Sequence, residues 1–506
     1  MNENIYALFA ERFPSDRGAS FIELPDGRCF RYANLEAESA RYARFLSGLG
    51  VSPGDRVTVQ VEKSPQALFF YLACLRAGFI YVPLNPSYRQ TEIEYFLDDA
   101  EPSFVLCAPS LLGLTQPAAT RRGIAHVYTL DADGNGTLSA AVANTPATHD
   151  ICPVAQDDTA VILYTSGTTG RPKGAMITHR NLAANGLALH RAWGFRVDDV
   201  LLHALPIFHI HGLFVACHCV LLSGGKMIFL PKFDAAEIAR HLPRATVFMG
   251  VPTYYTRLLA LTDFGSDTCR HMRLFTCGSA PLLAQTFAEF KQRTGHTILE
   301  RYGMTETGMN TSNPLNGERH AGTVGPALPG VSLRIVDAQE HEVAAGEVGE
   351  LLVKGDNVCK GYWRQPDKTR DEFTADGYFH TGDLTRMDAD GYVAIVGRAK
   401  DLIISGGLNI YPKEIESYID RLDGVAESAV IGLPHPDFGE AVTAVVVRKP
   451  GRDDLTERHI LDALKGAIAG FKVPKAVFFV PELPRNTMGK VQKNILRERY
   501  SASPPR

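Results

Sequence analysis

Strand-like and helix-like segments alternate along most of this chain, and their order limits the folds that it can adopt. The run RVTVQV at 56–61 is followed by the helix-period segment PQALFFYLACLRAG at 65–78 and by a second apolar run, FIYVPL, at 79–84. A strand, a helix and a strand in this order predict parallel strands covered by helices. We therefore expect an α/β fold with mixed or parallel sheets. The same rhythm returns in three later runs: KMIFLP at 226–231, ATVFMG at 245–250 and MRLFTCG at 272–278.

The texture of the sequence changes at two places, and these changes predict domains. From about residue 322, short runs such as GEVGELLVKG and GYVAIVGR stand between glycine turns, which is typical of a small β-rich subdomain. After GRAKDLIISGG at 397–407, an α/β pattern resumes for about a hundred residues, enough for a further domain. We predict an N-terminal domain over 1–399, with the β-rich subdomain at about 322–399, and a small C-terminal domain over 400–506.

Composition and charge argue against several classes of protein. The 52 Lys and Arg residues nearly balance the 56 Asp and Glu residues, so no basic field predicts a nucleic-acid or anionic-lipid partner. The longest apolar segment, PIFHIHGLFVACHCVLL at 206–222, contains three histidines and falls short of the ~20 apolar residues of a membrane span. The nine scattered cysteines and a start without a secretory signal predict a reduced cytoplasmic protein. The oligomeric state is left open.

A glycine-rich loop predicts a phosphate site. The stretch LYTSGTTGRPKGAM at 163–176 follows the apolar run DTAVILY at 158–164. Its glycines let backbone N–H groups converge on anionic oxygens, and hydroxyls and a lysine add further donors. It is not a Walker A loop, because Gly174 stands where a Ser or Thr would hold Mg²⁺. A flexible surface turn is the alternative. The predicted nucleotide-binding residues of the loop are Thr165, Ser166, Gly167, Thr168, Thr169 and Lys173.

This loop resembles the signature of the adenylate-forming superfamily, which comprises acyl-CoA synthetases, amino-acid adenylation domains and beetle luciferases. Four more motifs similar to those of the superfamily follow in the expected order: YGMTE at 302–306, HTGD at 380–383, GRAKD at 397–401 and NTMGK at 486–490. The resemblance implies a large N-terminal domain with a β-barrel element and a mobile C-terminal domain hinged near Lys400. It also implies two steps that use ATP, Mg²⁺ and CoA. A carboxylate forms an acyl-adenylate and pyrophosphate, and a thiol then displaces AMP.

The resemblance also implies roles for single residues. Glu306 would hold Mg²⁺, which prefers carboxylate oxygen, and Thr305 would contact the α-phosphate. Asp383 and Arg398 would bind the ribose, and Lys490 would stabilise the adenylation transition state. The ordinary alternative for Asp383 and Arg398 is a surface ion pair. For Thr305 it is a helix cap, and for Lys490 it is a solvated lysine. Further nucleotide- or CoA-binding positions implied by the resemblance are Gly278, Ser279, Ala280, Tyr302, Gly406 and Gly407, with Lys400 at the hinge.

Arg301, in the stretch ERYGMTET at 300–307, bears on the choice of substrate. Many relatives have glycine at this position, and a buried arginine destabilises a protein by several kcal/mol unless its charge is paired. A substrate with a second carboxylate would pair with the guanidinium in a bidentate fork. Internal pairing with Glu300 or Glu306, or packing over the nucleotide, is the alternative.

The remaining pocket candidates also favour a short dicarboxylate. His209 stands where amino-acid-activating relatives usually carry an aspartate, which counts against an amino-acid substrate. An aromatic gate or a satisfied core histidine is the alternative to a malonate ligand at this position. Ser279 and Met304 complete the predicted substrate site, with Arg257 and His211 as further candidates. The stretches ERYGMTE, MNTSNP, ALPIFHIHGLFVA and LPRNTMGKVQKN resemble malonate-activating synthetases. We expect a ligase for malonate, and for methylmalonate if one additional methyl is tolerated. A synthetase for another short or aromatic acid, or a non-catalytic nucleotide-binding scaffold, is the alternative.

Overall fold

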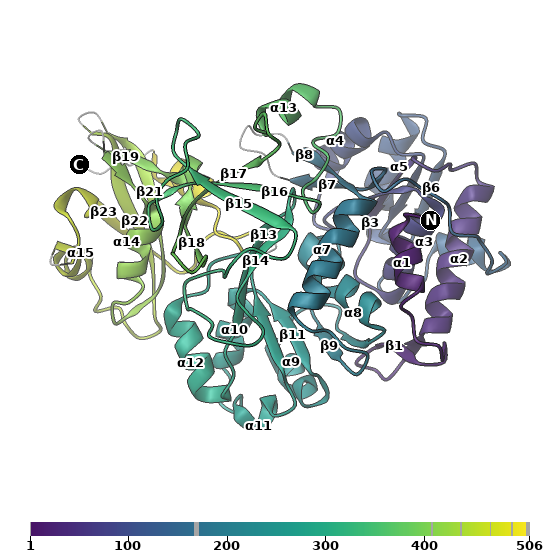
Figure 1. Ribbon diagram of the computed structural model, residues 1–506, viewed down its shortest axis with the longest axis horizontal. Helices are drawn as coiled ribbons and strands as arrows, with labels where there is room; N and C mark the ends of the chain where they lie inside the picture. Colours follow the sequence, from purple (N-terminus) through teal and green to yellow (C-terminus); the bar gives the residue numbers. More distant parts are fainter. Residues whose placement is uncertain are drawn as a thin grey trace.

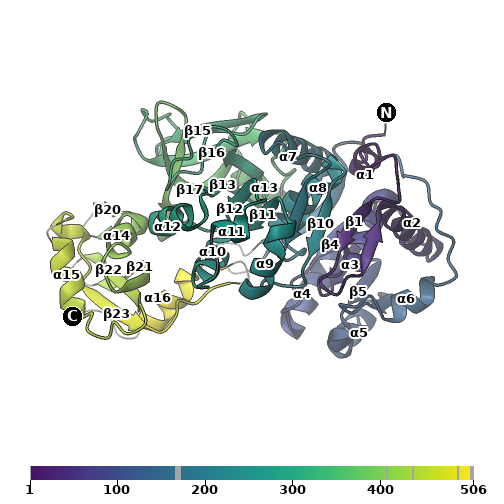
Figure 2. The ribbon, with the colours of Figure 1, turned by 90° about the horizontal axis from the view of Figure 1, so that it is seen from below.

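The computed structural model describes residues 2–165, 172–405, 408–435, 438–465, 467–486 and 489–501. Within these ranges the chain forms four β-sheets with helices around them. The first hundred or so residues lie at one end of the long axis and the C-terminal region at the other (Figure 1). Figure 2 shows the same arrangement from below, with the C-terminal sheet beside α10 and α12. The expected α/β fold with a β-rich part is confirmed.

The first sheet contains six strands in the order β6-β5-β3-β4-β7-β8, and all neighbours are parallel except β7 and β8. Helix α3, Pro65–Ala77, begins after the Ser64 N-cap with a proline in its first turn and is apolar on nearly every side. Such a helix is stable only when it is covered all round. The strands are β3 Arg56–Gln60, β4 Ile80–Pro83, β5 Phe104–Cys107, β6 His126–Thr129, β7 Thr159–Thr165 and β8 Lys173–Thr178.

The second sheet contains eight strands in the order β14-β13-β12-β11-β9-β10-β1-β2. Strands β9 to β13 and β1 run parallel, so their carboxyl ends meet at one edge. One face packs against α9 to α12, and the other faces α7, α8 and the first sheet (Figure 1). The strands are β1 Ser20–Glu23, β2 Cys29–Arg31, β9 Val200–His203, β10 Lys226–Phe229, β11 Val247–Gly250, β12 Leu274–Cys277, β13 Leu299–Met304 and β14 Gly308–Ser312.

Most helices of this large region follow amphipathic segments of the sequence and pack their apolar residues against a sheet or a neighbouring helix. The segment at 206–222 is buried, as its composition predicts, and forms a π-helix, His211–Cys217, that continues into α8, His218–Ser223. The others are α1 Ile5–Ala10, α2 Tyr32–Gly48, α4 Gln90–Ala100, α5 Leu112–Thr120, α6 Thr137–Val142, α7 His179–Ala192, α9 Ala235–His241, α10 Pro252–Leu259, α11 Ser266–Cys269 and α12 Ala284–Thr294.

The remaining chain forms two further sheets. Strands β15 Val331–Val336, β16 Gly349–Gly355, β17 Phe379–Met387 and β18 Val393–Arg398 pair antiparallel in that order, with α13, Pro366–Asp371, beside them. The C-terminal part has a hydrophobic core of its own. Its elements are β19 Ile403–Ser405, β20 Leu408–Ile410, α14 Pro412–Ile419, β21 Val425–His435, β22 Gly439–Arg448, α15 Glu457–Lys465, β23 Ala476–Val480 and α16 Lys493–Ser501.

No helix in the described ranges is long and apolar enough to cross a membrane. All nine cysteines are free thiols; seven of them are buried, Cys152 is half-buried and Cys29 is exposed. Buried thiols of this kind behave as small hydrophobic side chains.

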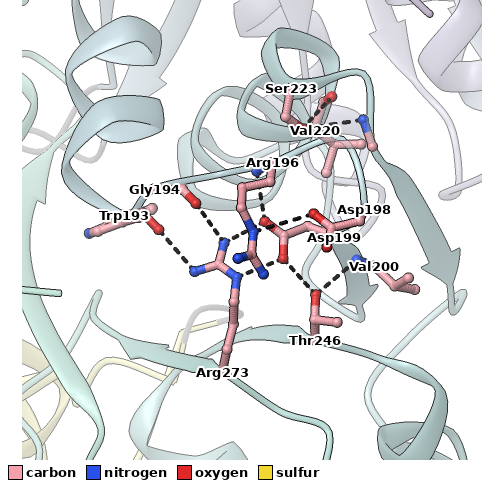
Figure 3. A network of polar contacts seen from close by, with 11 residues as sticks. Trp193, Gly194, Arg196, Asp198, Asp199, Val200, Val220, Ser223, Thr246 and Arg273 are labelled. Carbon is pink, nitrogen blue, oxygen red and sulfur yellow. Dashed lines mark hydrogen bonds and ion pairs between the residues drawn. The ribbon is translucent and has the colours of Figure 1, made fainter. Parts of the chain in front are cut away.

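An ion pair closes the amino edge of the eight-stranded sheet. Arg273, just before β12, binds Asp199, just before β9, with 2.6 Å between Nε and Oδ1 and a second contact from Nη2 (Figure 3). The two Nη atoms also donate to the carbonyls of Trp193 and Gly194, each at 3.1 Å. Burial alone would raise the pKa of Asp199, but the guanidinium holds it below its usual range. The guanidinium and the carboxylate therefore both have partners. The hydrogen bonds to Trp193 and Gly194 connect the end of α7 to β12.

Candidate active site

The predicted site residues lie where the large region meets the two smaller sheets. Gly278 and Ser279 follow β12, and the segment from Arg301 to Glu306 covers the carboxyl end of β13 and the turn to β14. Parallel sheets bind ligands at this edge, where loops leave the strands. Thr165 ends β7 and pairs with Lys173 at the start of β8, which places both ends of the predicted phosphate loop together. Six predicted positions lie outside the described residues: Ser166, Gly167, Thr168, Thr169, Gly406 and Gly407.

The predicted ribose-binding residues form one cluster. Asp383 on β17 pairs across the sheet with Arg398 on β18, and Arg398 Nε lies 2.7 Å from Asp383 Oδ1. The hydroxyl of Tyr302 donates to the other carboxylate oxygen. Each carboxylate oxygen has a second lone pair, so Asp383 can still accept hydrogen bonds from two hydroxyls of a sugar.

Lys490 lies close to this cluster although it belongs to the C-terminal part of the chain. Gly489 approaches α10 so closely that a Cβ atom there would lie 3.3 Å from Thr253 Oγ1. Desolvation and the neighbouring Arg398 lower the pKa of Lys490 to about 8, with Asp383 acting in the opposite direction. Part of the residue is still exposed to solvent. Lys400, in the turn Ala399–Asp401, is also exposed.

Glu306 is buried beside the phosphate loop. Its carboxylate accepts hydrogen bonds from the hydroxyls of Thr165, at 3.1 Å, and Tyr362, at 3.3 Å. The Tyr362 ring also lies 4.9 Å from Lys173 Nζ, and Lys173 contacts Glu372 at 3.3 Å. Burial raises the pKa of Glu306, and no cation forms an ion pair with it within the described ranges.

The surroundings of Glu306 fit a magnesium ion that is shared with a phosphate ligand. A buried carboxylate without an ionic partner is the hard oxygen ligand that Mg²⁺ prefers. In the part of the chain that the structure describes, no group of three or more His, Cys, Asp or Glu residues could hold a metal alone. Thr305 is half-buried in the turn between β13 and β14, next to Glu306.

Arg301 is a buried cation that forms no ion pair within the described ranges. Its side chain on β13 is 3% exposed, and its Nε and Nη2 atoms form no hydrogen bond in that part of the chain. Burial lowers its pKa to about 10. Glu300 points to the opposite face, as alternation along a strand requires, and accepts from the Gly322 N–H at 3.3 Å. Glu306 is engaged as described above, so no internal carboxylate pairs with Arg301 in the described ranges.

Gly278 makes room for Arg301. A Cβ atom at position 278 would lie 2.2 Å from Nη1 and 2.4 Å from Cζ of Arg301, so any side chain there would displace the guanidinium. The sequence assigned Gly278 to nucleotide binding and gave no sign of this contact, because it depends on the register of β12 against β13.

The predicted pocket histidines lie beside Arg301. Burial, and then the charge of Arg301, lower the pKa of His209 to about 4 and that of His211 well below its usual range. The Ser279 hydroxyl lies 3.3 Å from His211 Nδ1, and Met304 Sδ lies 4.0 Å from the Tyr302 hydroxyl. Arg257 is exposed in the last turn of α10. Arg301 thus lies near His209 and His211, and Ser279 contacts His211.

The fold and the arrangement of the site are those of an enzyme that uses a nucleotide. Two family models match the chain and lead to the same class. A model described as "AMP-binding enzyme" matches residues 7–363, and one described as "AMP-binding enzyme C-terminal domain" matches residues 414–490. The chain belongs to the AMP-binding enzyme family.

Individual proteins of known structure or named activity are similar to this chain over most of its length. The crystal structure of ATP-bound MatB from Rhodopseudomonas palustris is 54% identical and superimposes with a TM-score of 0.97 over 99% of both chains. The apo structure of MatB from the same organism gives 0.86 at the same identity and coverage. The malonate–CoA ligase of Arabidopsis thaliana is 34% identical over 94% of this chain and 85% of its own. A feruloyl-CoA synthase of an Amycolatopsis species is 37% identical over 94% of both chains.

Proposed function

We propose that this protein is an AMP-forming ligase that joins malonate to CoA with ATP. The observation that carries the proposal is Arg301, a buried guanidinium at the carboxyl edge of the sheet with two nitrogens that have no partner among the described residues. A single acyl carboxylate is consumed in the reaction, so a permanent cation deep in the pocket calls for a second one. The Arabidopsis relative, a malonate–CoA ligase by name, supports the same substrate.

The proposed first half-reaction forms malonyl-adenylate. One carboxylate oxygen of malonate attacks the α-phosphorus of ATP, and pyrophosphate leaves with the electrons of the broken P–O bond. Both reactants are anions, so fixed cations lower the barrier, and Lys490 and Lys173 supply them. Asp383 and Arg398 hold the ribose, and Thr305 holds the α-phosphate. Mg²⁺ bound at Glu306 would neutralise charge on the phosphates.

The proposed second half-reaction transfers the acyl group. The thiol sulfur of CoA attacks the acyl carbon, its proton is lost, and AMP leaves with the electrons of the acyl–phosphate bond. Lys490 has no task in this step. We propose that the C-terminal domain, 400–506, turns about Lys400 relative to 1–399 and brings the loop at 405–407 towards the pantetheine arm. The free thiols and the balanced charge support a cytoplasmic protein that needs neither nucleic acid nor a membrane.

The test is AMP release by the purified protein with ATP, Mg²⁺ and CoA. Malonate, methylmalonate, acetate, succinate and benzoate are compared, with the wild type and the Arg301→Ala variant. We expect malonate to be preferred, methylmalonate to follow within about 10–200-fold, and the preference to disappear in the variant. A preference for acetate, or for an aromatic acid as the feruloyl-CoA synthase relative would favour, would refute malonate as the substrate and keep the two-step chemistry.

A further inference from the structure

A short link joins the large region to the C-terminal sheet. Strand β18 ends at Arg398 and β19 begins at Ile403, with the turn Ala399–Asp401 between them. Ile403 is 1% exposed and belongs to the C-terminal hydrophobic core, whereas Ala399 and Lys400 are exposed. A rotation of one part against the other must change the backbone dihedrals of a few residues in such a link. Which residues can rotate depends on how each end of the link is held.

The amino end of the link is held by the large region. Arg398 Nε lies 2.7 Å from Asp383 Oδ1, and Arg398 Nη1 donates to the carbonyl of Thr381 at 3.2 Å. Asp383 and Thr381 belong to β17, and both are buried. Such a pair resists separation, because separation would leave a buried charge without its partner. Arg398 therefore moves with β17.

The carboxyl end of the link is held by helix α16. The Asp401 carboxylate accepts a hydrogen bond from Arg497 of α16, with 2.7 Å between Nη2 and Oδ1. The side chain of Asp401 is 18% exposed and that of Arg497 is 29% exposed. Burial alone would raise the pKa of Asp401, but Arg497 and Lys493 hold it below its usual range. Because this pair is partly screened from water, it is stronger than an ion pair at an open surface.

Helix α16 is itself anchored to the C-terminal part. Leu496 is fully buried and packs in a cluster with residues of β21 and β22. Lys493, one turn before Arg497, binds the carboxylate of Glu416 on α14 at 2.6 Å. Residues four apart lie on the same face of a helix, so both cations face the C-terminal part. Arg497 is therefore fixed to this part, and Asp401 moves with it.

We propose that Arg497 is a positioning residue that fixes Asp401 to the C-terminal part and so confines the rotation between the half-reactions to Ala399 and Lys400. The two ion pairs lie on either side of these residues and connect to different parts of the protein. Without Arg497, Asp401 and Leu402 can rotate as well, and the C-terminal part reaches more orientations. This inference rests on the proposed function and on its turn about Lys400.

The two half-reactions should depend on this ion pair to different degrees. In the described arrangement Gly489 approaches Thr253 of α10 and α14 packs against β18, so contacts outside the link also hold the C-terminal part. A turn about Lys400 gives up these contacts, and the orientation then depends more strongly on the link. A reacting group that is misplaced by about 1 Å can lower a rate about 10²-fold. Loss of Arg497 should therefore act mainly on acyl transfer.

The experiment compares the two half-reactions in Arg497→Met. Malonate-dependent exchange of pyrophosphate into ATP measures the first, and AMP release from pre-formed malonyl-adenylate and CoA measures the second. We expect the second rate to fall about tenfold and the first to stay within about twofold of the wild type. Arg497→Lys, which keeps the charge but not the planar fork, should recover the second rate to within about threefold.

The matched control is Arg452→Met, which breaks another ion pair of the C-terminal part. Arg452 binds Asp423 and, with 3.0 Å between Nε and Oδ1, Asp454, and none of the three belongs to the link or to α16. The ratio of its two rates should equal that of the wild type. Asp401→Asn should show the same loss as Arg497→Met, and the double variant should show no further loss, because both changes break one pair.

The outcomes keep this inference apart from the proposed function. A wild type without malonate-dependent exchange refutes the malonate ligase, and the acid that it does activate then replaces malonate in both assays. A wild type that catalyses both half-reactions, with Arg497→Met unchanged in both or slowed equally in both, refutes the positioning role alone. An equal loss together with a lower free energy of unfolding would assign Arg497 to stability. If Arg497→Met does not fold, Asp401→Asn takes its place and the same ratio decides.

Discussion

Two largely buried arginines, Arg273 and Arg301, lie at opposite edges of the eight-stranded sheet, and they differ in their hydrogen-bond and ion-pair partners. Arg273 at the amino edge binds Asp199 and two backbone carbonyls (Figure 3). Arg301 at the carboxyl edge is more buried, yet two of its nitrogens have no partner and no carboxylate pairs with it in the described chain. Arg273 joins elements of the fold, whereas Arg301 is available to pair with a ligand.

The difference teaches how structural and functional cations can be told apart. A buried charge that serves the fold is fully paired, because an isolated one is unstable in a medium of low polarity. A buried charge that serves a ligand stays unpaired until the ligand arrives, and its neighbours must accommodate it. Gly278 does so for Arg301 by having no side chain.

The first prediction concerns the structural arginine. Arg273→Met leaves the Asp199 carboxylate buried without its partner, and we expect a loss of about 3–5 kcal/mol in the free energy of unfolding, measured by urea denaturation. KM for malonate should not change in the folded fraction. As a control, Arg273→Met combined with Asp199→Leu should recover part of the stability, because no charge is then left unpaired. If Arg273→Met lowered the malonate affinity as much as a variant of Arg301 does, Arg273 would also serve substrate binding, and the two arginines would not differ in role.

The second prediction concerns the functional arginine. Arg301→Met should lower kcat/KM for malonate by about 10³-fold, which corresponds to about 4 kcal/mol of a buried charge pair. The free energy of unfolding should stay the same or rise, because the variant removes an unpaired charge. Steady-state kinetics and urea denaturation measure the two effects. A variant as destabilised as Arg273→Met would show that Arg301 also serves the fold.

Sequence and structure agree on the parts of the protein that depend on local pattern. The runs at 56–61, 65–78 and 79–84 form β3, α3 and β4, because period and burial specify such elements directly. Glu306, Asp383 and Lys490 were predicted from short motifs, and the structure places Asp383, Arg398 and Lys490 together.

The contacts between motifs could not be predicted in the same way. Nothing in the stretch at 278–280 indicates that Gly278 touches Arg301, since the contact depends on the register of β12 against β13. The choice between an internal and an external partner for Arg301 was open for the same reason. His211 was only a candidate, because the unpaired state of Nε2 becomes visible when every neighbour is placed.

The third prediction tests whether Gly278 serves Arg301 or the nucleotide. Gly278→Ala should displace the guanidinium and lower kcat/KM for malonate by about 10²-fold, the effect of misplacing a binding group by about 1 Å. The matched control is Gly113→Ala in α5, where an added Cβ meets nothing within 4 Å. In the Arg301→Met background, Gly278→Ala should have little further effect. A rise of KM for ATP in both backgrounds would instead assign Gly278 to the nucleotide.

The fourth prediction extends the comparison to a cation whose charge depends on pH. Desolvation and Arg398 lower the pKa of Lys490 to about 8, below the value near 10.4 of a free lysine. The ammonium is therefore present below pH 8 and is lost above it, unlike the guanidinium of Arg301. If Lys490 stabilises the adenylation transition state, malonate-dependent exchange of pyrophosphate into ATP should fall about fivefold from pH 8 to pH 9 beyond any change in substrate charge.

The control for this prediction is a cation that keeps its proton. Lys490→Arg should retain its activity between pH 8 and pH 9, because a guanidinium stays charged there, even if its different shape lowers the rate at every pH. Release of AMP from pre-formed malonyl-adenylate and CoA should not depend on Lys490 in this way, since the second half-reaction adds no negative charge beside it. A pH profile shared by both half-reactions, or by wild type and Lys490→Arg, would place the titrating group elsewhere. Lys490 would then be a solvated surface lysine that neither pairs within the fold nor acts on a substrate.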